Sequence, residues 1–172
     1  MKKQLILTLA LLFSVTATFA QSAKKKKVDK DTKEWRYEIE CSGIGSDGTY
    51  LVKVWSYSKK PEIAILQAKK NAVHGVIFKG FGGGPRECTS QRPLASDPNI
   101  EDEKSDYFDK FFEDGGQYMK YVTESSDGSI DAHDRLKIGK EYKIGIIVSI
   151  QKEKLRQDLE AAGIIKGLSS GF

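Results

Sequence analysis

The chain has 172 residues, with 28 lysines and arginines against 24 aspartates and glutamates, which gives a formal net charge of +4. This length fits one domain with a sizeable core, and the nearly balanced charge leads us to expect no nucleic-acid partner. The two cysteines and two distant histidines do not make a zinc site, which needs four clustered ligands, or three and a water. We therefore expect no metal and no cofactor.

Residues 1–20 have the pattern of a cleavable signal peptide. Lys2 and Lys3 precede an apolar run from residue 5 to residue 15, and Thr18 and Ala20 supply small residues for cleavage after Ala20. The apolar run is short of the ~20 residues that span a bilayer. We expect an exported protein, periplasmic or secreted, without a transmembrane segment in the mature chain. Removing the two signal lysines leaves 26 basic and 24 acidic side chains.

Residues 21–33 are polar and aperiodic, which predicts a disordered basic leader. It contains four consecutive lysines at positions 24–27. One interpretation is a solvated tail. The other is contact with anionic lipid or polymer, which usually needs a second membrane signal for stable association.

Two strands are predicted next. Residues 34–41 alternate apolar and charged side chains, with Trp35, Tyr37 and Cys41 on one face. Residues 49–57 form a second run that is rich in β-branched and aromatic side chains, and the intervening Ser46–Gly48 segment has turn chemistry. Together these patterns predict an antiparallel hairpin.

Residues 61–79 have helical spacing of apolar side chains and begin at Pro61, a favourable first helical position. Ala64, Ala68 and Ala72 recur every four residues and would let the helix approach its sheet closely. Gly80 is a natural helix end.

Residues 81–100 are irregular and rich in glycine and proline. The glycines at 82–84 do not match a phosphate loop, because a helix precedes them and a proline follows them. We predict a surface loop that contacts a partner through Phe81, Arg86 and Arg92. The alternative is an insertion that the fold tolerates, since loop-closure entropy grows slowly with length.

The remaining elements complete an α+β pattern. We predict a helix over residues 101–113, a strand over 118–123, an exposed hairpin within 130–138, a strand over 141–150 and a helix over 151–162. This order favours a single domain, residues 34–166, in which helices pack on one face of an antiparallel sheet. Residues 167–172 are predicted to be a flexible C-terminus.

Cys41 and Cys88 allow two interpretations. In an oxidising compartment they can form a disulfide, whose loop of about 47 residues would contribute about 3–4 kcal/mol in the chain-entropy model. The alternative is a pair of buried free thiols.

The alanine spacing of residues 64–72 and the ending of the chain also resemble a known family. That ending has Gly139, Tyr142 and alternating aliphatic residues, followed by Leu155 and Leu159. Over residues 35–165 the chain resembles the N-terminal domain of flagellar assembly protein T and the related LPP-type small envelope lipoproteins. The resemblance implies a non-catalytic envelope component that binds other proteins, and it carries over no set of functional residues.

Three functions follow as hypotheses. The first is an exported, non-catalytic protein-interaction module with other envelope proteins as partners. The second is a hydrolase-like enzyme with a site assembled from loops; its first suspects are Asp131, His133 and Asp134 with Glu38 or Glu40. The third is surface or polymer binding through aromatic side chains. These aromatic candidates are Trp35, Trp55 and Tyr57.

Overall fold

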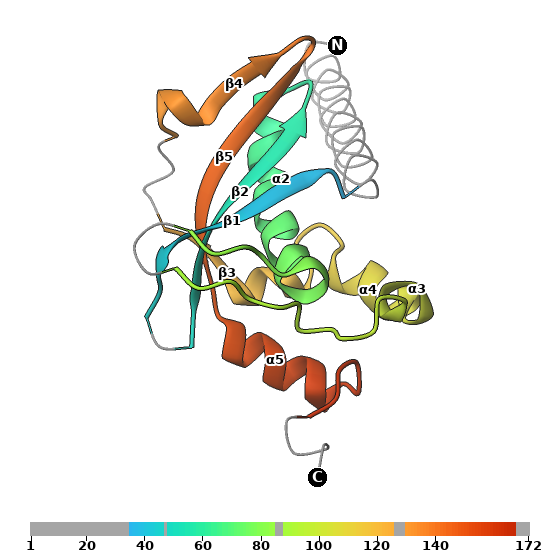
Figure 1. Ribbon diagram of the computed structural model, residues 1–172. Coiled ribbons are helices and arrows are strands. Elements are labelled where there is room, and N and C mark those ends of the chain that lie inside the picture. The colour runs from blue at the N-terminus through green and yellow to red at the C-terminus, as the bar shows by residue number, and fades with distance from the viewer. Residues whose placement is uncertain (1–34, 47, 85–87, 126–129, 168–172) are drawn as a thin grey trace, which may run out of the picture.

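The computed structural model describes residues 35–46, 48–84, 88–125 and 130–167. The predicted signal peptide, the basic leader, Arg86 and residues 168–172 lie outside these ranges. The described chain is α+β, with helices on one face of an antiparallel sheet, as the sequence predicts (Figure 1).

The sheet has five strands in the order β1-β2-β5-β3, and β4 also pairs with β5. The strands are β1 (Tyr37–Ile44), β2 (Tyr50–Ser58), β3 (Val122–Glu124), β4 (Arg135–Ile138) and β5 (Glu141–Ile150). β3 pairs with residues 148–150 of β5, and β4 pairs with residues 141–144. Both short strands therefore lie along the same edge of β5, one at each end.

Alternation along the three long strands separates a buried face from an open face. The buried face includes four fully buried side chains, those of Val52, Val54, Ile144 and Val148. α2 (Pro61–His74) covers this buried face and lies behind the sheet in Figure 1. A π-helical turn, Gly75–Lys79, continues α2 and ends at Gly80.

Small residues let α2 and its continuation approach the sheet. Ala64, Ala68 and Ala72 are fully buried, in agreement with the predicted close packing. At Gly75 a Cβ atom would lie 2.9 Å from the Cδ1 atom of Ile39 in β1. An added side chain would have to displace Ile39, so glycine at this position allows the close approach of the helix to β1.

The predicted helix over residues 101–113 is two short helices, α3 (Ile100–Glu103) and α4 (Ser105–Phe111), separated at Lys104. The predicted strand over 118–123 begins instead as a 3-10 turn, Gln117–Tyr121, before β3. In that turn Tyr118 and Tyr121 are buried on one side, because residues three apart align in a 3-10 helix. The chain ends with α5 (Lys152–Ala161).

The segment after Gly80 is part of the fold. Phe81 is buried and packs edge-on against Tyr50, so its ring is not available to a partner, contrary to its predicted role in an interaction loop. Phe81 and Gln91 exchange backbone hydrogen bonds of 3.0 and 2.9 Å. Arg92 remains exposed. A role of this segment in partner binding stays a prediction that rests on its polar residues.

Cys41 and Cys88 form a disulfide, with their Cα atoms 6.0 Å apart. The bond joins β1 to the segment that follows Gly80. Beside it, Gly82 bridges to Glu40 in parallel, so this segment covers part of the outer edge of β1. The disulfide hypothesis is confirmed. Among the described residues, no helix is long and apolar enough to cross a bilayer.

Candidate functional site

The open face of the sheet carries the most distinctive set of side chains. Alternation places Trp55 and Tyr57 of β2 on this face, beside Glu38 and Glu40 of β1 and Lys143 of β5. Figure 1 shows these strands in front of α2. We call this set, together with Lys53, the aromatic face.

Trp55 is seated on a glycine. It is paired with Gly145 of β5, where an added Cβ atom would lie 2.9 and 3.0 Å from two atoms of the indole ring. The ring therefore extends over the backbone of β5. Its Nε1–H donates to the Oε1 atom of Glu40 at 2.8 Å, which fixes the orientation of the ring.

We expect Gly145→Ala to displace the Trp55 ring and to lower the free energy of unfolding by about 1–2 kcal/mol, as overpacking does. Denaturant unfolding followed by tryptophan fluorescence measures both effects. Gly82→Ala is the matched control, since its added Cβ atom meets nothing within 4 Å. Equal stability of the two variants would contradict the proposed packing of Trp55 on Gly145.

Ion pairs hold the charged side chains around these rings. Lys143 Nζ donates to Glu38 at 2.7 Å, and Tyr57 also donates to Glu38. These hydrogen bonds from Lys143 and Tyr57 lower the pKa of Glu38. The Nζ atoms of Lys53 and Lys143 lie 4.8 and 4.9 Å from the centre of the Trp55 ring. The aromatic face is thus preorganised, although each exposed pair contributes little to stability.

The residues suspected of catalysis are divided between an exposed turn and the open face of the sheet. Asp131 precedes the 3-10 turn Ala132–Asp134 and accepts from the backbone N–H of His133 at 3.0 Å and from its ring at 2.9 Å. The His133 side chain is 95% exposed. The bond from the His133 backbone, then that from its ring, lowers the pKa of Asp131. This is a turn motif in solvent.

Asp134 leaves that turn and pairs with Lys53. The structure therefore brings Asp134, Glu38 and Glu40 to the open face, where each accepts from a neighbouring side chain. These contacts hold the three carboxylates in place on the sheet, and each carboxylate keeps further acceptor positions.

Three side chains form a hydrogen-bonded series, with His74 in its middle, that the sequence did not predict. The Tyr37 hydroxyl lies 2.5 Å from Nδ1 of His74, and Nε2 of His74 lies 3.0 Å from Glu101. Because a carboxylate only accepts, Nε2 carries the proton and Nδ1 accepts from the tyrosine. Trp35 stacks on His74 with ring centres 3.6 Å apart.

These three side chains have the order of an acid–base relay, but Tyr37 and His74 lie in the core. Burial, followed by the charge of Glu101, raises the pKa of Tyr37 well above its ordinary value, which disfavours a nucleophilic phenolate. Burial also lowers the pKa of His74, whose side chain is almost inaccessible. The relay instead joins β1, α2 and α3. No sequence motif marks it, because its members are 37 and 27 positions apart.

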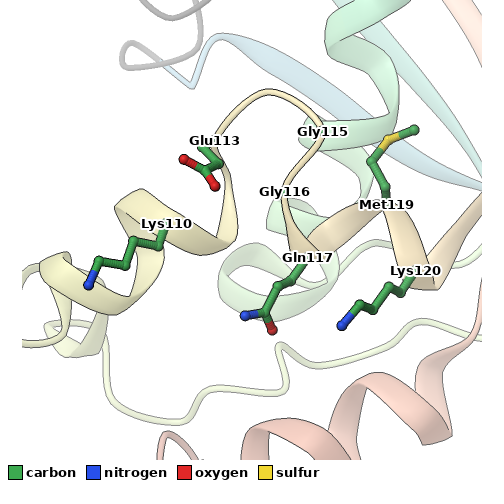
Figure 2. A pocket seen from close by; sticks show the side chains of 7 residues that line it. All are labelled: Lys110, Glu113, Gly115, Gly116, Gln117, Met119 and Lys120. Carbon is green, nitrogen blue, oxygen red and sulfur yellow. The ribbon is translucent and has the colours of Figure 1, made fainter.

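Three surface cavities lie away from both groups. The largest, about 580 Å³, is between α4 and the 3-10 turn that follows it. Figure 2 shows Lys110, Gln117 and Lys120 extending from one side of the ribbon and Met119 from the other. A second, about 260 Å³, lies beside Leu66 of α2, and a third, about 320 Å³, lies beside the disulfide. None of the three is lined by His74 or Trp55.

The described residues contain no group of three or more potential metal ligands. Of the three aromatic residues predicted to bind a surface or polymer, Trp55 and Tyr57 lie on the open face. Trp35 does not, because it packs against His74 and Phe112 on the helical side.

Comparisons of the chain with protein-family models, curated proteins and solved structures found no match.

Proposed function

We propose that this protein is an exported, non-catalytic binding module that presents the aromatic face to a partner protein in the cell envelope or outside the cell. The observation that carries the proposal is the seating of Trp55 on Gly145. A large, half-buried aromatic side chain is held on the open sheet face, in one orientation, by a glycine and by Glu40.

Preorganisation of this kind reduces the ordering cost of binding, and tryptophan and tyrosine are the residues most enriched at binding hot spots. The export part of the proposal is supported by the predicted signal peptide together with the disulfide, which persists in oxidising compartments. A partner in the envelope also agrees with what the resemblance to flagellar assembly protein T implies.

A second candidate is binding of a surface polymer such as a glycan. It is favoured by the same ring, because tryptophan beside paired carboxylates and ammonium groups offers a stacking surface with hydrogen-bonding groups around it. The two candidates predict different ligands for one face.

Site-directed photocrosslinking in the native cell tests the proposal. We expect a photoreactive residue at position 57 to give discrete protein adducts, because this side chain lies on the aromatic face. Position 66 is the matched control, since Leu66 is 52% exposed but lies on α2.

Equal adducts at positions 57 and 66, or adducts at neither, would argue against the aromatic face as a protein-binding surface. Retention of the exported protein on insoluble envelope polysaccharide, lost in Trp55→Ala and kept in Leu66→Ala, would select the polymer instead.

A further inference from the structure

The two outer edges of the sheet are treated differently. Along β1, the segment after Gly80 covers part of the edge: Gly82 bridges to Glu40, and Gly84 lies against the backbone of Cys41. The disulfide fastens this cover. β4 lies at the opposite edge, at the outside of the molecule in Figure 1. All four of its residues are exposed.

The register shows which backbone groups of β4 are free. Ile138 pairs with Glu141 across a two-residue turn that begins at Gly139, whose φ is +60°. The residues flanking such a turn share hydrogen bonds, and bonded and non-bonded pairs then alternate along the ladder. Arg135 and Lys137 are therefore in non-bonded pairs with β5. The N–H and C=O groups of Lys137 and the C=O group of Arg135 point away from the sheet, whereas the N–H group of Arg135 donates to the carbonyl of Ala132 in the preceding 3-10 turn.

The side chains of β4 are sorted by face. Leu136 and Ile138, 42% and 52% exposed, pair with Lys143 and Glu141 and so lie on the open face. Arg135 and Lys137 lie on the other face, and neither has a carboxylate partner among the described residues. An unpaired edge with two apolar and two cationic positions is a template for another strand.

We propose that β4 accepts an extended segment of a partner protein in which apolar and acidic residues alternate. The apolar residues would lie beside Leu136 and Ile138, and the acidic residues beside Arg135 and Lys137. A second copy of the chain fits poorly, because two antiparallel β4 strands with matching faces bring Lys137 beside Lys137, or Arg135 beside Lys137.

This inference shares with the proposed function only the premise that the chain acts by binding, since it concerns β4 and not Trp55. Protein adducts at position 57 without peptide binding at β4 would refute only the proposal that β4 binds a strand. Peptide binding at β4 without protein adducts at position 57 would refute only the proposal that the aromatic face binds a protein.

The test uses the oxidised protein and a fluorescent eight-residue peptide of alternating valine and glutamate. We expect this peptide to bind, and a peptide of the same composition with all four valines first to bind at least about tenfold more weakly, because it cannot sort its side chains by face. Amide exchange at Lys137 should slow in the complex, since its N–H group becomes hydrogen-bonded, whereas Arg135, whose N–H already donates to Ala132, should change less.

Charge reversal then identifies the site. Arg135→Glu/Lys137→Glu should weaken the valine–glutamate peptide about tenfold or more and favour a valine–lysine peptide. The control Lys154→Glu/Lys166→Glu makes the same change in net charge at exposed positions on and after α5, away from the edge, and should alter binding by less than about twofold. Lys137→Pro, which removes one outward N–H but no bond to β5, should abolish binding of both alternating peptides.

Three results would overturn the proposal: no binding of the alternating acidic peptide, equal binding of the block peptide, or equal weakening by the control pair. Self-association of the free protein that Arg135→Glu/Lys137→Glu abolishes would also overturn it, by naming a second copy as the occupant.

Discussion

Replacement of both Cys41 and Cys88 by alanine should lower the free energy of unfolding by about 4 kcal/mol, the largest loss that we expect from a change at two positions. The bond closes a loop between residues 47 apart, and the chain-entropy model gives this magnitude for a loop of that length. Because domains of this size are stabilised by only about 5–15 kcal/mol, the loss would be a large fraction of the total stability.

Urea denaturation of the oxidised protein, the reduced protein and the double variant measures this loss. The reduced protein is the matched control, because it breaks the same bond without changing either side chain, and it should unfold close to the double variant. A loss below about 1 kcal/mol in both the reduced protein and the double variant would show that backbone hydrogen bonds alone hold the segment after Gly80 against β1. Amides at the edge of β1 should also exchange faster in these two proteins than in the oxidised one.

Much of the fold could be predicted because its signals are local. The hairpin, the first helix, the last strand and the last helix each have a clear period of two or 3.6 residues. The alternation in residues 141–150, for example, predicts the bounds of β5 correctly. The π-helical turn at the end of the first helix has no such signal.

The predictions are wrong where contacts between residues distant in the sequence determine the structure. The segment after Gly80 looks like a surface loop because it lacks periodicity, yet Phe81, Cys88 and Ala95 are in the core. The backbone of Leu94 and Ala95 bonds to Val76 and Ile77, and such partners cannot be identified from spacing. The 3-10 turn before β3 likewise makes aromatic contacts that spacing does not reveal, Tyr121 with Phe111 and Tyr118 with Phe112.

The candidate sites show the same division. The sequence singled out Trp35, Trp55 and Tyr57 as aromatic residues that could bind a surface. It could not show that Gly145 lies beneath Trp55, because the pairing of β2 with β5 joins positions about ninety residues apart. The free edge of β4 also could not be predicted from the sequence, since it depends on which strands lie at the edges of the sheet. His74 was not singled out, because nothing near it in the sequence distinguishes it from other helical residues.

The buried His74 relay should make the protein less stable as the pH falls below about 6.5. Burial lowers the pKa of His74 in the folded protein, against the opposing effects of Glu101, whereas the unfolded chain keeps the ordinary value. The groups that face the ring are Tyr37 of β1, Glu101 of α3 and Lys79 of the π-helical turn; the charge of Lys79 also lowers the pKa of His74.

The direction of this pH dependence follows from the number of protons that each state binds. Above about pH 6.5 both states hold a neutral His74, so this residue gives no pH dependence. Below that pH the unfolded state binds a proton that the folded state does not, and the free energy of unfolding falls by up to about 1.4 kcal/mol per pH unit. The loss ends where the pH reaches the lowered pKa of the folded state.

Urea denaturation at a series of pH values between 5.5 and 7.5 measures this slope, in a range above the titration of most carboxylates. His74→Gln should be less stable at pH 7.5, because it loses the stacking on Trp35, and it should lose the slope. His133→Gln is the matched control: it removes the other histidine, which is exposed, and should keep both the stability and the slope. If His74→Gln kept the slope, or if stability rose as the pH fell, a neutral His74 accepting from Tyr37 would be the wrong description of this core.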